Sequence, residues 1–196
     1  MSNISFFILF MANQINLANP GPLGLMGFGM TTVLLNIHNA GFFPVTTAIV
    51  AMGIFYGGLA QVIAGILEYR KNNTFGVTAF TSYGFFWLTL VSIWYLPTSP
   101  KTAETDSVFL GIYLAMWGIF TAFMFIGTLK ANRALQFVFA SLTVLFTLLA
   151  FGNITGNATV LKIAGFEGIV CGACAIYLAM AEVINEQFGR KVLPIG

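Results

Sequence analysis

The sequence predicts an all-α integral membrane protein with six transmembrane helices, and three observations carry that prediction. First, 58% of the 196 residues are hydrophobic and only 7% are charged, whereas a soluble domain carries about 25% charged residues. Second, the windows 72–100, 107–129 and 134–161 contain no Asp, Glu, Lys or Arg, and each is long enough for a membrane-crossing helix of about 20 residues. Third, the apolar runs lack the alternation at every second residue that β-barrel strands show.

The expected helices follow one another closely, with links that contain Gly, Asn and Pro. We place the helices at residues 20–38, 46–69, 78–95, 108–129, 134–152 and 164–184. The chain then divides into an N-terminal leader (1–19), a transmembrane domain (20–186) and a cytoplasmic tail (187–196). Within the leader, residues 1–10 are an extension if synthesis begins at Met11.

The basic residues predict the orientation of the helices, because Lys and Arg favour the cytoplasmic side of short loops. Only Lys101 and Lys162 lie in the links after the first, third and fifth helices. The other basic residues follow the second, fourth and sixth helices: Arg70, Lys71, Lys130, Arg133, Arg190 and Lys191. With an even number of spans, both termini are expected to face the cytoplasm.

The first helix is expected to begin at a proline-rich stretch. Asn19 suits a helix cap, and Pro20 and Pro22 suit the first helical turn, where a missing N–H breaks no helical bond. The N–H groups left on Gly21 and Leu23 point out of the helix and could meet an anion. A rigid helix start with no ligand is the alternative interpretation. The whole stretch is Asn19, Pro20, Gly21, Pro22, Leu23, Gly24 and Leu25.

The even-numbered helices carry small residues at helical spacing, such as Gly53 with Gly57 and Gly168 with Gly172. Such pairs allow close helix packing, either within one subunit or between subunits. The segment Ile-Tyr-Leu-Ala-Met also occurs twice, at 112–116 and 176–180. This recurrence suggests a two-helix unit used three times around an axis, with the odd-numbered helices lining a path.

Each odd-numbered helix carries a bulky residue near its middle: Phe28, Tyr83 and Leu142. A ring of these side chains would form an apolar constriction that excludes hydrated ions, although aromatic residues in membrane helices commonly form core. Uncharged polar groups near the ring could hydrogen-bond a carboxylate or an amide, or the backbone of their own helices. They are Thr31, Asn36, Asn39, Thr81, Ser82, Ser141, Asn153 and Asn157.

Other function classes lack support in the sequence. The motifs of metalloproteases, nucleophile-elbow hydrolases and P-loop enzymes do not occur, so we expect no enzyme. The pair Cys171 and Cys174 is expected to pack as small apolar residues, and neither a metal, a cofactor nor a nucleic acid is expected to bind. Glu167 is expected near the outer end of its helix, which leaves the bilayer centre without a proton-relay carboxylate.

The proline-rich stretch, followed by Met26-Gly27-Phe28-Gly29-Met30-Thr31-Thr32, resembles the signature of the acetate uptake transporter family, the bacterial succinate-acetate permeases. The resemblance continues through residues 53–58, 78–84 and 135–139 to 185–190. One position departs from the family signature, because this chain has Gly21 where the family has Ala. The loss of one methyl group loosens the first helical turn without altering the assignment.

The resemblance implies a six-helix subunit in a ring-shaped homohexamer in the cell inner membrane, with a separate path through each subunit. It implies that acetate and succinate pass through this path and that Phe28, Tyr83 and Leu142 form its constriction. It also implies that Leu142 and Ala175 set substrate range, and that Asn19 lies near the cytoplasmic mouth.

Neither the residues nor the resemblance decides whether the anion or the protonated acid crosses, or whether transport is passive or proton-coupled. A hexameric urea or amide channel remains the alternative function.

Overall fold

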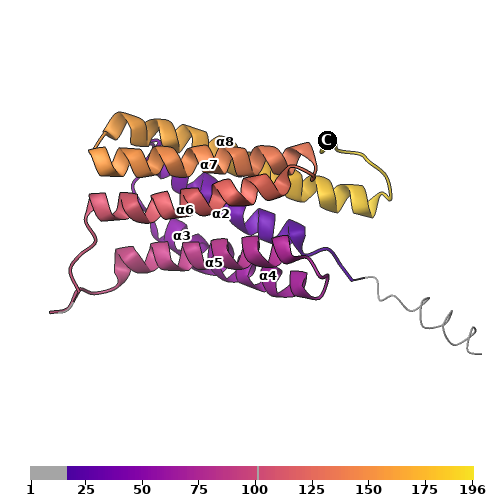
Figure 1. Cartoon of the computed structure of the whole chain (residues 1–196), viewed down its shortest axis with the longest axis horizontal. Helices are drawn as coiled ribbons and strands as arrows, with labels where there is room; N and C mark the ends of the chain where they lie inside the picture. Colours follow the sequence, from indigo (N-terminus) through magenta and orange to yellow (C-terminus); the bar gives the residue numbers. More distant parts are fainter. Residues whose placement is uncertain (1–16, 101) are drawn as a thin grey trace, which may run out of the picture.

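The computed structural model describes residues 17–100 and 102–196, so the expected extension 1–10 and a start at Met11 lie outside it. The described chain forms antiparallel helical rods of similar length (Figure 1). The helices are α2 (Gly21–Asn39), α3 (Thr47–Ala51), η1 (Met52–Ala60), α4 (Gln61–Tyr69), α5 (Thr74–Tyr95), α6 (Ser107–Thr128), α7 (Arg133–Thr155) and α8 (Ala158–Gln187). Because α3, η1 and α4 form one continuous rod, the described chain has six rods, as predicted.

Five of the described rods are long and apolar enough to cross a membrane, and the sixth, α2, differs from them in composition. Helix α2 has 19 residues, and glycines together with Thr31, Thr32 and Asn36 interrupt its apolar run. It packs against α8, η1, α4 and α5, so protein covers many of these residues. The prediction of an all-α membrane protein is therefore confirmed, with five of the six expected spans meeting the length and composition of a membrane helix.

Asparagine and aspartate side chains fix where four of the helices begin. Each accepts a hydrogen bond from a backbone N–H in the first turn, which satisfies a donor that the helix leaves free. The caps of α5, α6, α7 and α8 are Asn73, Asp106, Asn132 and Asn157. The start of α2 differs from the prediction, because the cap position is Pro20 and the Asn19 side chain instead accepts from the Gly21 N–H (3.2 Å).

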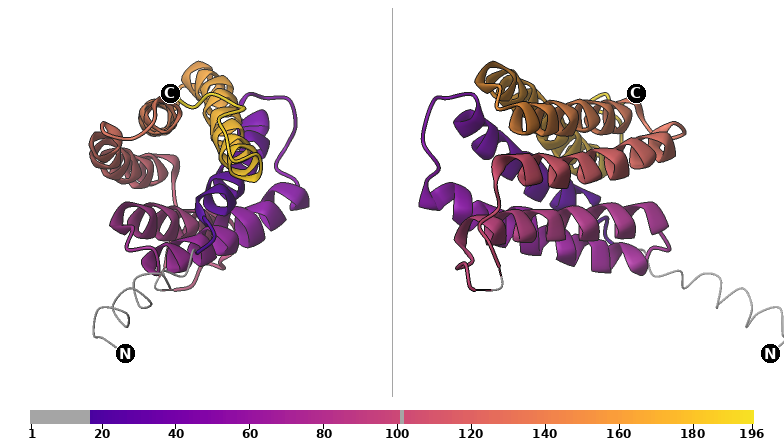
Figure 2. Two further views of the ribbon diagram at one scale, coloured as in Figure 1. Left: turned by 90° about the vertical axis from the view of Figure 1, so that its right-hand side faces the viewer. Right: turned by 60° about the vertical axis from the view of Figure 1, so that its left-hand side comes forward.

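The rods enclose a common axis, which the end-on view in Figure 2 follows. Helix α8 packs on α2 and α7, α7 packs on α6, and the rod from α3 to α4 packs on α2 and α5. The α2–α8 crossing is close, because a Cβ added at Gly29 would lie 2.7 Å from the Gly172 carbonyl oxygen, and one at Gly172 would lie 2.7 Å from that of Gly29. These backbones can touch only where both residues lack a side chain.

The small residues of the even-numbered helices are used inside the subunit. Gly53 and Gly57 of η1 face Trp87 and Val91 of α5, and Gly168 of α8 faces Asn36 of α2. For these glycines the structure favours the first of the two interpretations, packing within one subunit.

The α5–α6 seam closes the bundle in a different way, through aromatic side chains. The backbones of α5 and α6 approach each other at few points. Phe86 stacks on Tyr113 with ring centroids 6.0 Å apart, and Tyr83 meets Phe120 edge-on at 5.4 Å. The large aromatic rings thus fill the space between the widely separated backbones of α5 and α6.

The last nine residues fold back onto the bundle. The Asn185 side chain accepts from the N–H groups of Val192 and Leu193 (2.7 and 2.8 Å). Tyr177 donates to the Pro194 carbonyl, and the Ala134 N–H donates to that of Ile195. The expected tail is therefore docked against α7 and α8, at the end of the bundle where α2 begins.

Candidate functional site

A cavity of about 160 Å³ opens inside the bundle at the end where α2 begins. We call it the acidic vestibule, because Glu68 of α4 and Glu182 of α8 line it together with Asn19 and Asn73. Most of the other lining side chains are apolar: Leu25, Phe28, Phe75, Ala79, Phe80, Leu135, Val138, Phe139 and Leu142. Helices α4 and α8 contribute Gln61, Glu68 and Glu182 to this lining, which corrects the expectation that the odd-numbered rods alone line the path.

Amide groups hold both carboxylates of the acidic vestibule in place. Asn73 Nδ2 donates to Glu68 Oε2 (2.8 Å), and Asn19 Nδ2 donates to Glu182 Oε2 (3.0 Å). Lys71 Nζ donates in turn to Asn19 Oδ1 (3.2 Å) from an exposed position. Because the Gly21 N–H is already bonded to Asn19 and Glu182 lies beside it, the start of α2 faces a carboxylate of the chain itself. At Gly21 the structure therefore favours the alternative interpretation, a helix start with no ligand.

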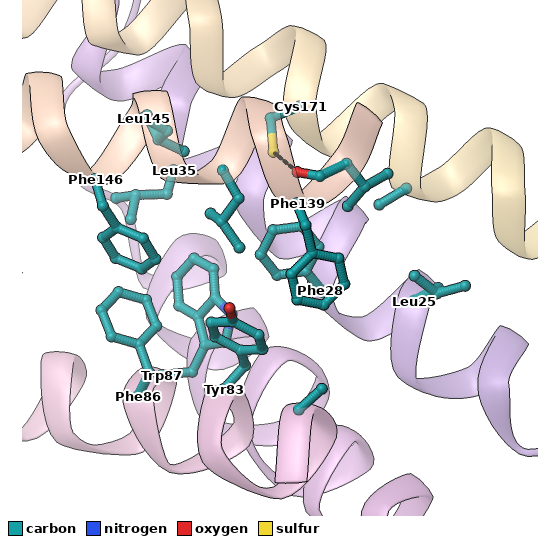
Figure 3. Close-up of a cluster of buried hydrophobic side chains, with 14 of the residues drawn as sticks. Leu25, Phe28, Leu35, Tyr83, Phe86, Trp87, Phe139, Leu145, Phe146 and Cys171 are labelled. Carbon is teal, nitrogen blue, oxygen red and sulfur yellow. Dashed lines mark hydrogen bonds between the residues drawn. The ribbon is translucent and has the colours of Figure 1, made fainter. Parts of the chain in front are cut away.

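Phe28, Tyr83 and Leu142 line the same cavity, and each is at most 5% exposed. The rings of Phe28 and Tyr83 have centroids 6.1 Å apart, and the hydroxyls of Tyr83 and Thr121 are hydrogen-bonded (2.9 Å). Figure 3 shows Phe28, Tyr83 and Phe139 gathered in the middle of the bundle, with Leu25 toward one end of it. The three residues singled out from the sequence therefore share one lumen.

A second cavity, of about 450 Å³, lies at the opposite end of the bundle. We call it the second vestibule; Leu35, His38, Asn39, Trp94 and Asn153 are among its lining residues, with Leu90 and Leu149 at greater depth. Leu35, Leu90 and Leu149 each follow a ring residue by seven positions: Phe28, Tyr83 and Leu142. Seven residues bring a helix back to nearly the same face about 10 Å further along its axis. The two vestibules therefore lie on one line through the bundle.

A plug of large side chains separates the two vestibules. Phe86, Trp87, Leu145 and Phe146 are all at most 6% exposed. They follow Tyr83 and Leu142 by three or four residues, about one helical turn, and Figure 3 shows Phe86 and Phe146 to one side of Tyr83 and Phe28. Phe86 contacts Trp87 and Phe146 with ring centroids 5.6 and 5.2 Å apart. The closed section is thus a plug about two helical turns thick, where the sequence predicted a single ring.

The polar groups expected near the ring divide into two sets. Asn39 and Asn153 line the second vestibule. The others bond to nearby backbone or face other helices: Thr31 donates to the Met52 carbonyl (3.4 Å), Asn36 donates to that of Thr32 (2.9 Å), Thr81 faces Gly65, and Asn157 caps α8. Ser82 is half-buried and lines neither vestibule.

Ala175, the second residue expected to set substrate range, is fully buried. It lies on the α8 face that carries Glu182, seven residues before Glu182, but it does not line the acidic vestibule.

Glu167 lies deeper than expected. Ser141 Oγ donates to Glu167 Oε1, and Ser141 adjoins Leu142 in the chain. Glu167 therefore lies level with the ring, between α7 and α8, and its placement near the outer end of the helix is wrong. Its Oε2 is buried without a hydrogen-bond partner in the described part of the chain.

The sequence analysis did not single out Gln61, Glu68 or Glu182 as site residues. Gln61 and Glu68 are 1% and 2% exposed, lie on one face of α4 and both line the acidic vestibule. Polar residues seven positions apart in an apolar helix are a signal that could have found this pair, because side chains at that spacing share a face.

Comparisons with known proteins identify relatives of this chain by sequence and by structure. The chain is 67% identical over 180 residues to the succinate-acetate/proton symporter SatP of Escherichia coli K12, covering 92% of this chain and 96% of that protein. It is 40% identical over 178 residues to the ammonia transport outward protein 2 of Saccharomyces cerevisiae, covering 87% of this chain and 63% of that protein. A solved structure of the bacterial acetate channel SatP superposes with a TM-score of 0.90 at 67% identity, covering 92% of this chain and all of that one.

The model of the GPR1/FUN34/yaaH family matches residues 6–194. That match spans nearly the whole chain and confirms the resemblance found in the proline-rich signature. The chain belongs to the GPR1/FUN34/yaaH family.

Proposed function

We propose that this protein is a membrane channel or transporter for small carboxylates, with acetate and succinate as substrates. The observation that carries the proposal is the 67% identity, over 92% of the chain, to a relative named a succinate-acetate/proton symporter. The two vestibules on one line give such solutes an entrance and an exit within one subunit. Identity to the relative named for ammonia transport is lower, at 40%, which favours the carboxylates.

In this proposal Phe28, Tyr83 and Leu142 form the constriction that the solute meets after the acidic vestibule. Their burial around one lumen supports that role. Leu142 and Ala175 set substrate range, since both lie on helices that face the path. Asn19, Pro20, Pro22, Leu23, Gly24 and Leu25 build the mouth, where Asn19 links Lys71 to Glu182.

The proposal places the mouth of the acidic vestibule on the cytoplasmic side of the inner membrane. Arg70, Lys71 and Arg133 lie at that end of the bundle, and basic residues favour the cytoplasm. Both described chain ends lie there as well, since Asn19 is bonded to Glu182. We further propose, from the family resemblance, a homohexamer. Every subunit keeps its own path in this proposal, because both vestibules lie within the helical bundle of one chain.

Flux measurements in proteoliposomes test the function. Uptake of labelled succinate is the main readout, because succinate carries two carboxyl groups and leaks through lipid far more slowly than acetic acid, and protein-free vesicles give the background. Uptake is expected to exceed that background and, for a proton-coupled carrier, to rise when an inward proton gradient is imposed. Uptake of urea or ammonium that exceeds uptake of succinate and acetate would decide against the proposal.

A further inference from the structure

We propose that the second vestibule holds a binding site for a carboxylate anion, in which the imidazolium of His38 and the indole N–H of Trp94 donate hydrogen bonds to the carboxylate oxygens. This inference rests on the proposed function, because its ligands are the same small carboxylates. In the proposed orientation, the site lies at the end of the path that an acid enters from outside the cell. It assigns His38 and Trp94 as substrate-binding residues.

The first step is the tautomer of His38. Its ring lines the second vestibule from the last turn of α2. His38 Nδ1 lies 2.7 Å from the carbonyl oxygen of Phe43, and because a carbonyl oxygen can only accept, Nδ1 carries a hydrogen. Nε2 makes no hydrogen bond with the described residues. Nε2 is therefore the ring nitrogen left for a ligand, and it becomes a charged donor when the ring is protonated.

The second step is a free indole donor. Trp94 of α5 lines the same cavity and packs against the buried core, although tryptophans near the ends of membrane helices commonly lie at the lipid headgroups. Its Nε1–H can only donate, and it has no hydrogen-bond partner within residues 17–100 and 102–196. An anion in the second vestibule can accept a hydrogen bond from this group.

The third step is the two amides of the lining, which add neutral donors. Asn39 Nδ2 donates to Asn36 Oδ1 (3.0 Å), and Asn153 Nδ2 donates to the Leu149 carbonyl (2.8 Å). A carboxamide nitrogen carries two hydrogens, so Asn39 and Asn153 each keep one N–H for a ligand. The second vestibule therefore has more donors than its own protein groups use.

The backbone brings these donors to one level of the bundle. His38, Trp94 and Asn153 come from α2, α5 and α7, the three rods that carry the ring. Residues three or four apart share a face of a helix, and each of the three follows by that spacing a leucine that lines the second vestibule: Leu35, Leu90 and Leu149. The polar groups therefore lie about one turn nearer the outer opening than these leucines, around the same path.

The charge of the lining favours an anion. His38 is the one titratable group among the described residues that line the second vestibule. In the acidic vestibule, by contrast, Glu68 and Glu182 already take the amide donors of Asn73 and Asn19. A carboxylate that leaves water needs donors or a cation in exchange. The second vestibule supplies both and sets no carboxylate against it.

Charged groups on the neighbouring elements do not line the site. Helices α3 and α5 contain no Asp, Glu, Lys or Arg, and on α7 the one charged residue, Arg133, lies at the opposite end. The charged groups of α8 and of the loop before α6 that lie toward this end of the bundle are outside the lining: Lys162, Glu167, Glu104 and Asp106. Of these, Glu167 is bonded to Ser141. A change in the charge of His38 is therefore expected to dominate the pH dependence of the site.

Acetate binding to the full chain in lipid nanodiscs tests the inference. Binding of ¹³C-labelled acetate is followed by ligand-detected NMR at pH 6 and pH 8. Acetate stays almost wholly ionised at both values, because carboxyl groups have a pKa of about 4, whereas histidine side chains change their charge between pH 5 and 8. Acetate should therefore bind about 10-fold more tightly at pH 6, where a charged donor is available.

His38→Asn is the variant that isolates Nε2. The Asn Nδ2 can still donate to the Phe43 carbonyl, but no group takes the place of Nε2. The variant should bind acetate at pH 6 about as weakly as the wild type does at pH 8, with no change of affinity between the two pH values. Its thermal midpoint should match that of the wild type, because the loop contact is kept. A pH dependence of equal size in the variant would assign the effect to another group and overturn the inference.

A pair of tryptophan variants tests the second donor. Trp94→Phe removes Nε1–H and keeps an aromatic ring, so acetate binding at pH 6 should weaken about 5-fold, the effect of one neutral hydrogen bond. The same change at Trp117 of α6, which lines neither vestibule, should leave binding unchanged. Wild-type affinity in Trp94→Phe would remove Trp94 from the site.

Succinate uptake by the wild-type protein in proteoliposomes separates the two proposals. If the wild type takes up succinate while His38→Asn binds acetate as the wild type does, only the inference about the second vestibule fails. If the wild type takes up neither acid above background, the proposed function fails, and the acetate-binding data then decide the site by themselves.

Discussion

At the scale of single residues, we expect Leu142 to limit how large a solute can pass. Its side chain is 3% exposed and lines the acidic vestibule with Phe28 and Tyr83. Leu142→Ala removes most of one wall of the ring, so lactate uptake relative to acetate uptake should rise by about 10-fold. Competition between the labelled acids in proteoliposomes measures the ratio. Leu67→Ala, at an exposed position on α4, is the matched control, and equal selectivity in both variants would contradict the constriction.

Tyr83 separates the shape of the ring from its hydrogen bonding. Tyr83→Phe keeps the aromatic ring in place but removes the hydroxyl bonded to Thr121, while Thr121 keeps its own bond to the Trp117 carbonyl (2.7 Å). We expect unchanged size selectivity and a loss of about 1 kcal/mol in the free energy of unfolding. Denaturation in detergent measures the loss, and a change in selectivity would show that the hydroxyl itself contacts the solute.

At the scale of helices, the α2–α8 crossing requires glycine at the contact, because a side chain there would clash with the facing backbone. A Cβ at Gly172 would lie 2.7 Å from the Gly29 carbonyl oxygen, whereas one at Gly118 of α6 would meet only Phe146 Cβ at 3.4 Å. Gly172→Ala should therefore destabilise the bundle by about 1–3 kcal/mol, and Gly118→Ala should not. Thermal unfolding of the two variants compares them; equal midpoints would mean that α2 and α8 can separate without cost.

The sequence predicted the six helical rods because their signal is coarse: long charge-free runs interrupted by caps such as Asn73 and Asn157. It did not predict η1, since the wider hydrogen-bonding pattern of a π-helix leaves the residue types unchanged. It made the last helix too short at both ends, at 164–184 against Ala158–Gln187, because charged residues such as Lys162 and Glu186 look like parts of links although they continue the helix. The ends of such helices depend on tertiary contacts, which cannot be inferred from residue composition.

The candidate site was predicted on its apolar side and missed on its polar side. Phe28, Tyr83 and Leu142 could be found because bulky residues recur at similar intervals on three rods. Gln61, Glu68 and Glu182 could not be placed in the same cavity, because their convergence depends on how α4 and α8 rotate about their axes. That rotation follows from contacts such as Gly27 against Tyr56 and Gly29 against Gly172, and helical periodicity within one rod does not define it.

At the scale of the whole molecule, the two vestibules divide the subunit into an acidic end and an end that carries His38 and Asn39. The plug between them is apolar over about 10 Å, a thickness that excludes hydrated ions. An anion that crosses such a section must lose the water around its charge, which costs free energy, whereas a neutral acid has no net charge to desolvate. The apolar plug is therefore expected to select for the neutral form.

Because residues of one chain line both vestibules, each subunit of an assembly should transport independently. Ala79 lines the acidic vestibule and is 2% exposed, so a thiol reagent coupled to an Ala79→Cys variant would fill the cavity. Assemblies that mix wild-type and Ala79→Cys subunits are treated with the reagent, and succinate uptake is measured against the fraction of variant. Wild-type assemblies treated in the same way control for Cys171 and Cys174. Uptake should fall linearly with the variant fraction, since every blocked subunit removes one path, whereas a single lumen shared by six subunits would make uptake fall as the sixth power of the wild-type fraction.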